Sequence, residues 1–224
     1  MSMTPDSASY FKKVADQWDS LRSGYFTTAV REAAIQRAGL QPYMVVADIG
    51  AGTGFMAAGL APLVSHVHVV DGSAAMLEVA RRNLEEFSNV SYHESDGLAL
   101  PFPDASLEAV FANMYLHHTL DPLAAIREMV RILRPGGKLL ITDMDSHPYT
   151  WLKEEMADVW MGFEREQVRQ WFETAGLVDV AVDCTGQTCN AESGNTAVEA
   201  ADRQAAISVF VACGTRLPAS ERRV

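Results

Sequence analysis

From residue 44 onward, short apolar runs rich in β-branched residues alternate with segments whose apolar positions repeat at helical spacing. Because β-α-β units produce this alternation, it predicts an α/β fold with a mostly parallel sheet. Seven strands are expected, at residues 44–49, 66–71, 89–95, 107–113, 137–143, 177–184 and 206–213. The first five contain nearly continuous apolar runs, which are typical of strands covered by helices on both faces.

The intervening helices carry recognisable ends. Ser73 is suited to cap one helix, and Asp121 with Pro122 is suited to begin the next. A third helix is expected over residues 164–175, where Gly176 ends it. Residues 1–40 predict two more helical stretches, which either pack on the core or close over a ligand, and the two roles are compatible.

The last two strands differ from the others. Apolar residues alternate with polar ones over residues 177–184, which indicates a strand near an edge with one wetter face and with Cys184 pointing inward. Residues 185–204 form a long polar link without a helical face, and this link is expected to hold Cys189. Such a link is either mobile or functional, and the pattern leaves that choice open.

The length and composition of the chain limit the classes of function that it can have. A chain of 224 residues is long enough for one domain, which we divide into a helical cap (1–40), a cofactor-binding core (41–145), and a substrate-side lid with a terminal β-hairpin (146–224). A net charge of −11 argues against a nucleic-acid partner. The N-terminus lacks a secretory pattern, and the uncharged stretch 49–70 reads as loop, helix and strand, so we expect a cytoplasmic protein without a membrane partner. Three cysteines are expected to be free thiols.

A glycine-rich loop, "DIGAGTG", follows the first strand at residues 48–54. Glycines there let the backbone approach a ligand closely, and Asp71 at the end of the second strand is placed to accept hydrogen bonds from ribose hydroxyls. The spacing departs from a dinucleotide fingerprint, because Phe55 stands where its last glycine should be. After the third strand, Asp96 is placed to receive an adenine amino group.

Four stretches carry a family resemblance: "VVADIGAGTG", "VVDGSAAM", "ESDGLALPFPDASLEAVFANMYLHHTLDP" and "EMVRILRPGGKLLITD". In order and spacing, residues 45–143 resemble the class I S-adenosylmethionine-dependent methyltransferases, in the branch of ubiquinone and menaquinone biosynthesis. The resemblance implies a Rossmann-like, seven-stranded sheet whose seventh strand inserts antiparallel beside the sixth, with S-adenosyl-L-methionine as the cofactor. The flanking segments resemble a bacterial subgroup associated with ArsR-type regulators.

The resemblance also implies roles for individual residues. Asp48 would support the glycine loop, Asp71 would hold the ribose, and the other cofactor contacts would lie around the methionine, adenine and sulfonium groups. The residues with these implied roles are Asp48, Gly50, Ala51, Gly52, Asp71, Gly72, Met76, Asp96, Gly97, Leu98, Asn113 and Met114.

Methyl transfer from a sulfonium is an in-line displacement, so the protein must chiefly align the two reactants. A base is needed only for an acceptor that holds its proton tightly, and His117, His118 and His147 are the candidates. We expect no metal site. The Met and aromatic residues over 151–163 either pack in the core or form an acceptor pocket.

The leading interpretation is a methyltransferase acting on a small molecule. The fourth strand ends in Asn-Met-Tyr-Leu rather than the Asn/Asp-Pro-Pro-Tyr/Phe loop of amino-methylating relatives, which argues against nucleic-acid and protein substrates. Three alternatives remain open: an arsenite methyltransferase that uses thiolates of Cys184 and Cys189, a sensor that binds S-adenosylmethionine without catalysis, and a nicotinamide-dependent oxidoreductase. The pattern leaves the acceptor and the oligomeric state undefined.

Overall fold

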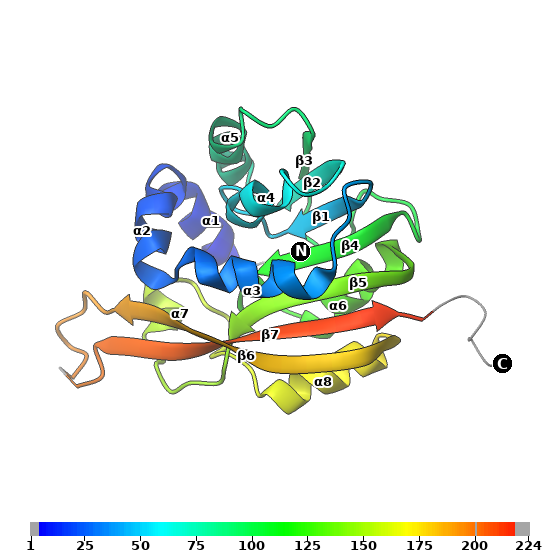
Figure 1. The fold of residues 1–224 in the computed structure, drawn as a ribbon. Helices are drawn as coiled ribbons and strands as arrows, with labels where there is room; N and C mark the ends of the chain where they lie inside the picture. Colours follow the sequence, from blue (N-terminus) through cyan, green and yellow to red (C-terminus); the bar gives the residue numbers. More distant parts are fainter. Residues whose placement is uncertain (1–4, 200, 218–224) are drawn as a thin grey trace.

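A computed structural model describes residues 5–199 and 201–217. Its centre is a seven-stranded sheet in the order β3-β2-β1-β4-β5-β7-β6 (Figure 1). The strands are β1 (Val45–Ile49), β2 (His66–Asp71), β3 (Val90–Glu94), β4 (Leu107–Asn113), β5 (Leu133–Met144), β6 (Leu177–Glu192) and β7 (Gln204–Arg216). The first five pair in parallel, and β7 lies antiparallel between β5 and β6. The predicted fold class is confirmed, including the inserted last strand.

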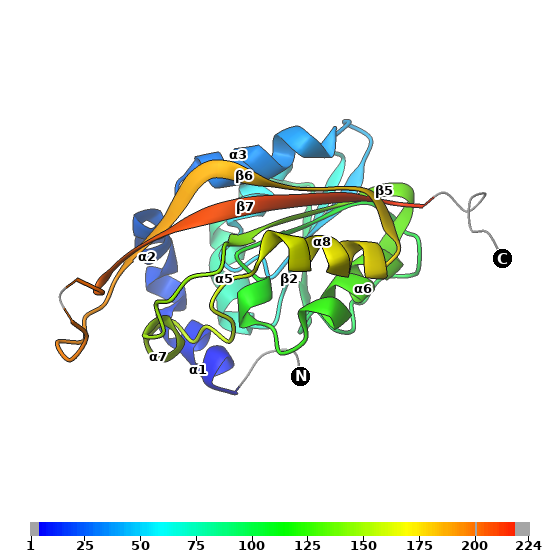
Figure 2. The ribbon, with the colours of Figure 1, turned by 90° about the horizontal axis from the view of Figure 1, so that it is seen from below.

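Helices cover both faces of this sheet. The helical segments are α1 (Pro5–Val14), η1 (Ala15–Gln17), α2 (Trp18–Tyr25), α3 (Thr28–Ala38), α4 (Phe55–Leu60), α5 (Ala74–Asn83), η2 (Leu116–His118), α6 (Pro122–Ile132), α7 (Leu152–Glu155) and α8 (Arg165–Thr174). One core layer packs α3, α4 and α5 against the sheet, and a second packs α6 and α8 against the opposite face (Figure 2). Strands buried on both faces explain the continuous apolar runs of β1 and β4.

The predicted helix starts are confirmed. The hydroxyl of Ser73 accepts a hydrogen bond from the backbone N–H of Met76 at 3.4 Å, and the carboxylate of Asp121 accepts one from Ala124 at 3.0 Å. Pro122 occupies the first turn of α6, where its missing N–H costs nothing. These caps fix where α5 and α6 leave the sheet, and therefore where the loops before them lie.

The C-terminal hairpin is longer than the sequence predicts. Half of the expected polar link is strand, because Thr188–Glu192 pairs with Gln204–Ser208 in an antiparallel ladder. The polar residues of this part of β6 face solvent, while Cys189 and Ala191 face inward. An edge strand with one solvent-exposed face tolerates this composition. The prediction of an irregular link over residues 185–204 was therefore wrong over its first half. The extension of the hairpin passes beneath α2 (Figure 1).

Within the described ranges, every helix is too short or too polar to cross a bilayer.

Candidate cofactor and acceptor site

The main cavity lies at the carboxyl ends of β1, β2 and β4. The strand order reverses between β1 and β4, and open α/β sheets bind ligands at such a point. The cavity has an empty volume of about 710 Å³, which includes space open to solvent. It is lined by Phe11, Trp18, Arg22, Phe26, Gly50, Ala51, Gly52, Phe55, Asp71, Gly72, Met76, Ser95, Asp96, Gly97, Asn113, Met114, Tyr115 and His118.

The glycine loop forms the floor of this cavity. Gly50, Gly52 and Gly54 have φ angles of +66°, +54° and +89°, a region that other residues rarely adopt. The N–H of Gly52 donates to Asp71 Oδ2 at 2.7 Å, and the N–H of Ser73 donates to Asp71 Oδ1 at 2.8 Å. One carboxylate therefore ties the loop to the start of α5. Burial raises the pKa of Asp71, and the two N–H donors oppose that shift.

Asp48 lies beneath the loop rather than in the cavity lining. Its side chain is fully buried, and Oδ2 accepts a hydrogen bond from the N–H of Ala57 at 3.0 Å. Burial raises the pKa of Asp48 to about 7. The contact holds the start of α4 against β1, so Asp48 supports the cavity indirectly.

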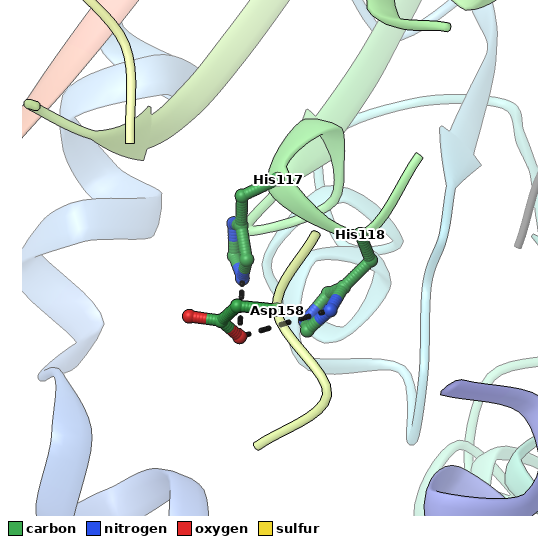
Figure 3. Close-up of side chains that lie close together, drawn as sticks. All are labelled: His117, His118 and Asp158. Atoms are coloured by element: carbon green, nitrogen blue, oxygen red, sulfur yellow. Dashed lines mark ion pairs between the residues drawn. The ribbon is translucent and has the colours of Figure 1, made fainter. Parts of the chain in front are cut away.

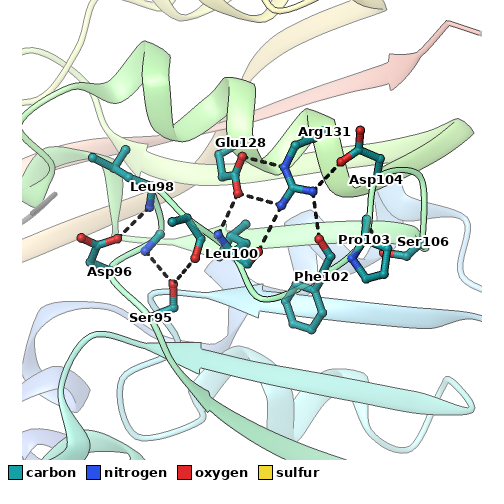
Figure 4. A network of polar contacts seen from close by, with 12 residues as sticks. Ser95, Asp96, Leu98, Leu100, Phe102, Pro103, Asp104, Ser106, Glu128 and Arg131 are labelled. Atoms are coloured by element: carbon teal, nitrogen blue, oxygen red, sulfur yellow. Dashed lines mark hydrogen bonds and ion pairs between the residues drawn. The ribbon is translucent and has the colours of Figure 1, made fainter.

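The loop after β3 forms the second wall, and α6 anchors it (Figure 4). The guanidinium of Arg131 donates to the carbonyls of Leu100 and Phe102 at 3.1 and 2.8 Å. Glu128, which is paired with Arg131, accepts the N–H of Leu100 at 2.7 Å. At the cavity end, Asp96 Oδ1 accepts the N–H of Leu98 at 3.1 Å. Leu98 itself stays outside the cavity lining.

The predicted cofactor residues gather around this one cavity, apart from Asp48 and Leu98. The N-terminal segment contributes Phe11, Trp18, Arg22 and Phe26 to the lining, and none of these was among the predicted site residues. The helical spacing of Phe11 and Trp18 indicated a helix that either packs on the core or closes over a ligand, and Arg22 and Phe26 gave no signal. The N-terminal helices both pack on α5 and cover the cavity, so the two roles considered for them coexist.

A second cavity of about 480 Å³ adjoins the first. The two share Trp18, Phe26, Met114 and His118. The rest of the second lining is largely apolar and comprises Tyr25, His117, Met144, Leu152, Met156, Asp158, Cys189, Ala191 and Ile207. Of the Met and aromatic residues predicted over 151–163, only Met156 lines this cavity, and Phe163 and Trp160 pack in the main core.

The polar end of the second cavity is built from His117, His118 and Asp158 (Figure 3). His117 Nδ1 lies 2.7 Å from Asp143 Oδ1, and His117 Nε2 lies 3.8 Å from Asp158 Oδ1. His118 Nδ1 also lies 3.8 Å from Asp158 Oδ1. In the described part of the chain, these three side chains alone bring metal-ligating atoms within 4.8 Å of one another, a donor set that zinc also uses.

Burial and neighbouring charges shift the pKa values of His117, His118 and Asp158 in different directions. Burial lowers the pKa of His117, but the carboxylates of Asp143 and Asp158 outweigh it and raise the value to about 9. Burial and the charge of His117 together lower the pKa of His118 well below its usual value. Burial raises the pKa of Asp158 to about 6.

His147 lies apart from the linings of both cavities. Its Nδ1 accepts the N–H of Tyr149 at 3.3 Å, and burial lowers its pKa to about 4. Of the three predicted base candidates, the structure therefore places two, His117 and His118, at the cavities.

The positions of Cys184 and Cys189 do not favour the alternative in which their thiolates hold an arsenite acceptor. Cys184 is exposed beside a bulge in β6, so the expectation that it points inward was wrong. Cys189 lies on β6 rather than in a loop and lines the second cavity. Burial raises the pKa of the Cys189 thiol to about 12, which disfavours the thiolate that a soft metalloid requires.

A family model described as "Methyltransferase domain" matches residues 47–141. Residues 47–141 carry the domain of the class I S-adenosylmethionine-dependent methyltransferases. The chain is 33% identical over 170 residues to the 2-methyl-6-phytyl-1,4-hydroquinone methyltransferase 2 of Oryza sativa subsp. japonica, with 74% of this chain and 48% of that protein covered. It is 38% identical over 115 residues to the ubiquinone/menaquinone biosynthesis C-methyltransferase UbiE of Shewanella sediminis, with 49% and 46% covered.

The solved YcgJ protein of Bacillus subtilis superimposes with a TM-score of 0.69 at 20% identity, over 85% of this chain and 99% of that one. The chain spans about half the length of the curated relatives it matches. The predictions of family, branch and S-adenosylmethionine as the cofactor are confirmed.

Proposed function

We propose that the chain transfers a methyl group from S-adenosylmethionine to a small, largely apolar molecule held in the second cavity. The observation that carries the proposal is the shared wall of the two cavities, formed by Trp18, Phe26, Met114 and His118. The first cavity, whose floor is the glycine loop, adjoins the more apolar second cavity at this wall. In-line displacement needs this arrangement, because the acceptor must approach the methyl carbon from the side opposite the sulfur.

The proposal assigns the first cavity to the cofactor. The backbone of Gly50–Gly52 would lie against the methionine part, Asp71 would accept the ribose hydroxyls, and Asp96 would meet the adenine. When bound, the cofactor supplies an activated methyl group on a sulfonium, and the protein aligns it and excludes water.

Arg22 is the candidate partner for the methionine carboxylate. Its guanidinium lies 4.1 Å over the ring of Phe55 at the cavity wall. Its Nε atom is buried and has no hydrogen bond within the described residues, although Asp19 Oδ1 lies 3.8 Å away. A buried donor of this kind favours an anionic ligand group, because an unsatisfied donor is costly.

We expect Arg22→Ala to weaken the affinity for S-adenosylhomocysteine by about 10- to 100-fold, the loss of one charged hydrogen-bonded contact. Arg127→Ala, which removes an exposed arginine on α6, should leave the affinity unchanged. Isothermal titration of both variants measures the difference. Equal affinities in the two variants would remove Arg22 from the cofactor site.

The names of the relatives suggest the acceptor class. They are called hydroquinone and quinone-biosynthesis methyltransferases. A hydroxylated ring suits the second cavity, where aromatic and Met side chains surround one polar end.

Thermal shift and turnover assays test the proposed function. S-adenosylhomocysteine should raise the melting temperature and NAD should not, because a ligand stabilises only the state that binds it. Incubation with labelled S-adenosylmethionine and a panel of hydroquinones and phenols should give a labelled product. Stabilisation by NAD alone would overturn the cofactor assignment, and stabilisation without any labelled product would overturn the catalytic one.

A further inference from the structure

Asp158 is a buried carboxylate whose hydrogen-bonding capacity is only partly used. It lies on the segment between α7 and α8, and the N–H groups of Val159 and Trp160 hold that segment against the carbonyl of His117 at 2.9 and 3.0 Å. The side chain of Asp158 is 3% exposed. Its Oδ2 atom has no hydrogen-bond partner in the part of the chain that is described. A buried acceptor without a donor is costly, so this oxygen indicates a ligand that brings a proton.

His117 faces Asp158 as a fixed donor. Its backbone N–H and Nδ1 both point to Asp143, at 3.4 and 2.7 Å, so the ring presents Nε2 to the second cavity. Two buried carboxylates flank this one ring, and within the described ranges neither forms an ion pair with Lys or Arg. The ring therefore keeps both of its protons and cannot take another, which excludes His117 as the base in its resting state.

The gap between the two groups fits a hydroxyl. His117 Nε2 and Asp158 Oδ1 are 3.8 Å apart, too far for a direct hydrogen bond. An acceptor O–H placed beside them would accept from Nε2–H and donate to Asp158. The cluster also borders the wall between the cavities, because His118 belongs to both linings and its ring centroid is 4.0 Å from that of His117. A hydroxyl oxygen held there would face the methyl group.

We infer that Asp158 takes the proton of a phenolic acceptor, that the His117 imidazolium stabilises the resulting oxygen anion, and that this phenolate is the nucleophile for the methyl group. This inference rests on the proposed function. The O–H bond breaks and its proton passes to Asp158. The phenolate, through its oxygen or a ring carbon, would then form the new bond to the methyl carbon while the C–S bond breaks and its electron pair stays on sulfur. A methylated ring carbon would afterwards lose its own proton to solvent. Asp158 returns its proton to solvent after product release.

Asp158 is the carboxylate of this cluster whose pKa burial raises toward neutral pH. The titratable groups facing it are His117, His118, Asp143, Tyr10, Tyr25 and Cys189. Burial raises the pKa of Tyr10 and of Cys189 to about 12, so both stay neutral. Since burial raises the pKa of Asp158 to about 6, methyl transfer should increase with pH through that value as the carboxylate forms.

The test uses 4-nitrophenol as the probe, because its anion absorbs visible light. The measurement is made at about pH 6.5 on the complex with S-adenosylhomocysteine. The absorbance of the 4-nitrophenolate anion should rise when the probe binds to wild-type protein, and this rise should be absent in Asp158→Asn. With S-adenosylmethionine, Asp158→Asn should lower kcat for methylation of the phenol by about 100-fold or more, and its kcat should then follow the ionisation of the phenol itself. The affinity of Asp158→Asn for S-adenosylhomocysteine should equal that of the wild-type protein.

Two further variants keep the test specific. Glu192→Gln makes the same change from carboxylate to amide on the exposed face of β6 and should behave as wild type. His117→Asn should also abolish the anion band, because the oxygen anion loses its donor. Full kcat in Asp158→Asn, or activity that a chelator abolishes and Zn²⁺ restores, would each overturn the inference.

Failure of the inference is distinguishable from failure of the proposed function. Wild-type protein that binds S-adenosylhomocysteine yet leaves the 4-nitrophenol spectrum unchanged overturns the inference and leaves the cofactor assignment standing. Protein that binds no S-adenosylhomocysteine overturns both.

Discussion

Asp71→Ala is expected to weaken the binding of S-adenosylhomocysteine by about 100-fold or more while the protein stays folded. The Asp71 carboxylate accepts the N–H groups of Gly52 and Ser73, at 2.7 and 2.8 Å, and it lines the cavity where the ribose is proposed to lie. Alanine removes the ribose acceptor and also frees the glycine loop. Each hydrogen bond to a charged group contributes about 1.5–3 kcal/mol, so the combined loss exceeds two orders of magnitude in Kd.

Isothermal titration and far-UV circular dichroism measure the two parts of this expectation. Asp71→Asn provides a graded comparison, because its amide oxygen still accepts one hydrogen bond, and its affinity should lie between those of wild type and Asp71→Ala. Glu173→Ala on the exposed side of α8 serves as the surface control. A wild-type Kd in Asp71→Ala would contradict the proposed ribose role.

The cofactor half of the site was predictable because its residues follow strand ends. Gly50, Asp71, Asp96 and Asn113 each come directly after, or close, a strand of the parallel sheet, and the carboxyl ends of such strands meet at one edge. Their positions in the chain therefore predicted their proximity in space.

The acceptor half was not predictable in the same way. Asp158 lies in a segment outside the parallel sheet, and the contacts that place it are tertiary. The segment of Asp158 is held by the carbonyl of His117, which lies about 40 residues earlier in the chain. Local periodicity carries no information about a contact of this kind, so Asp158 gave no signal in the sequence.

Cys189 is a second residue whose position could not be predicted from local sequence. A polar run without helical periodicity was interpreted as a loop, yet its alternation fits an edge strand whose partner, β7, supplies the ladder. Strand pairing of this kind depends on the partner strand and the hairpin turn between them. The inward position of Cys189 in the second cavity followed from that pairing alone.

The glycine loop was predicted for the right place but with an incomplete reason. The sequence argument requires glycine because a ligand approaches the backbone. A Cβ added at Gly52 would have room, because the nearest atom, Trp18 Nε1, would lie 3.6 Å away. At Gly50, however, an added Cβ would lie 2.2 Å from Cδ2 of Tyr115. Gly50 is therefore needed because the Tyr115 ring packs against the loop, whether or not a ligand is bound.

Gly50→Ala should consequently reduce the free energy of unfolding by about 2–5 kcal/mol. About 1–2 kcal/mol comes from placing alanine at a φ of +66°, and about 1–3 kcal/mol comes from displacing the buried Tyr115 ring. The ring cannot move freely, because its hydroxyl donates to the carbonyl of Asp96 at 3.2 Å and lies where a Cβ on Gly97 would be. Urea unfolding at constant pH measures the loss.

Gly136→Ala separates the two contributions. Gly136 has a φ of +81° and no atom within 4 Å of an added Cβ, so alanine there meets the backbone strain without the clash and should cost only about 1–2 kcal/mol. Adding Gly50→Ala to a Tyr115→Ala background should cost a similarly small amount, because the ring is gone. If Gly50→Ala proves as mild as Gly136→Ala, the Tyr115 ring yields readily, and the glycine at position 50 is then required by the ligand after all.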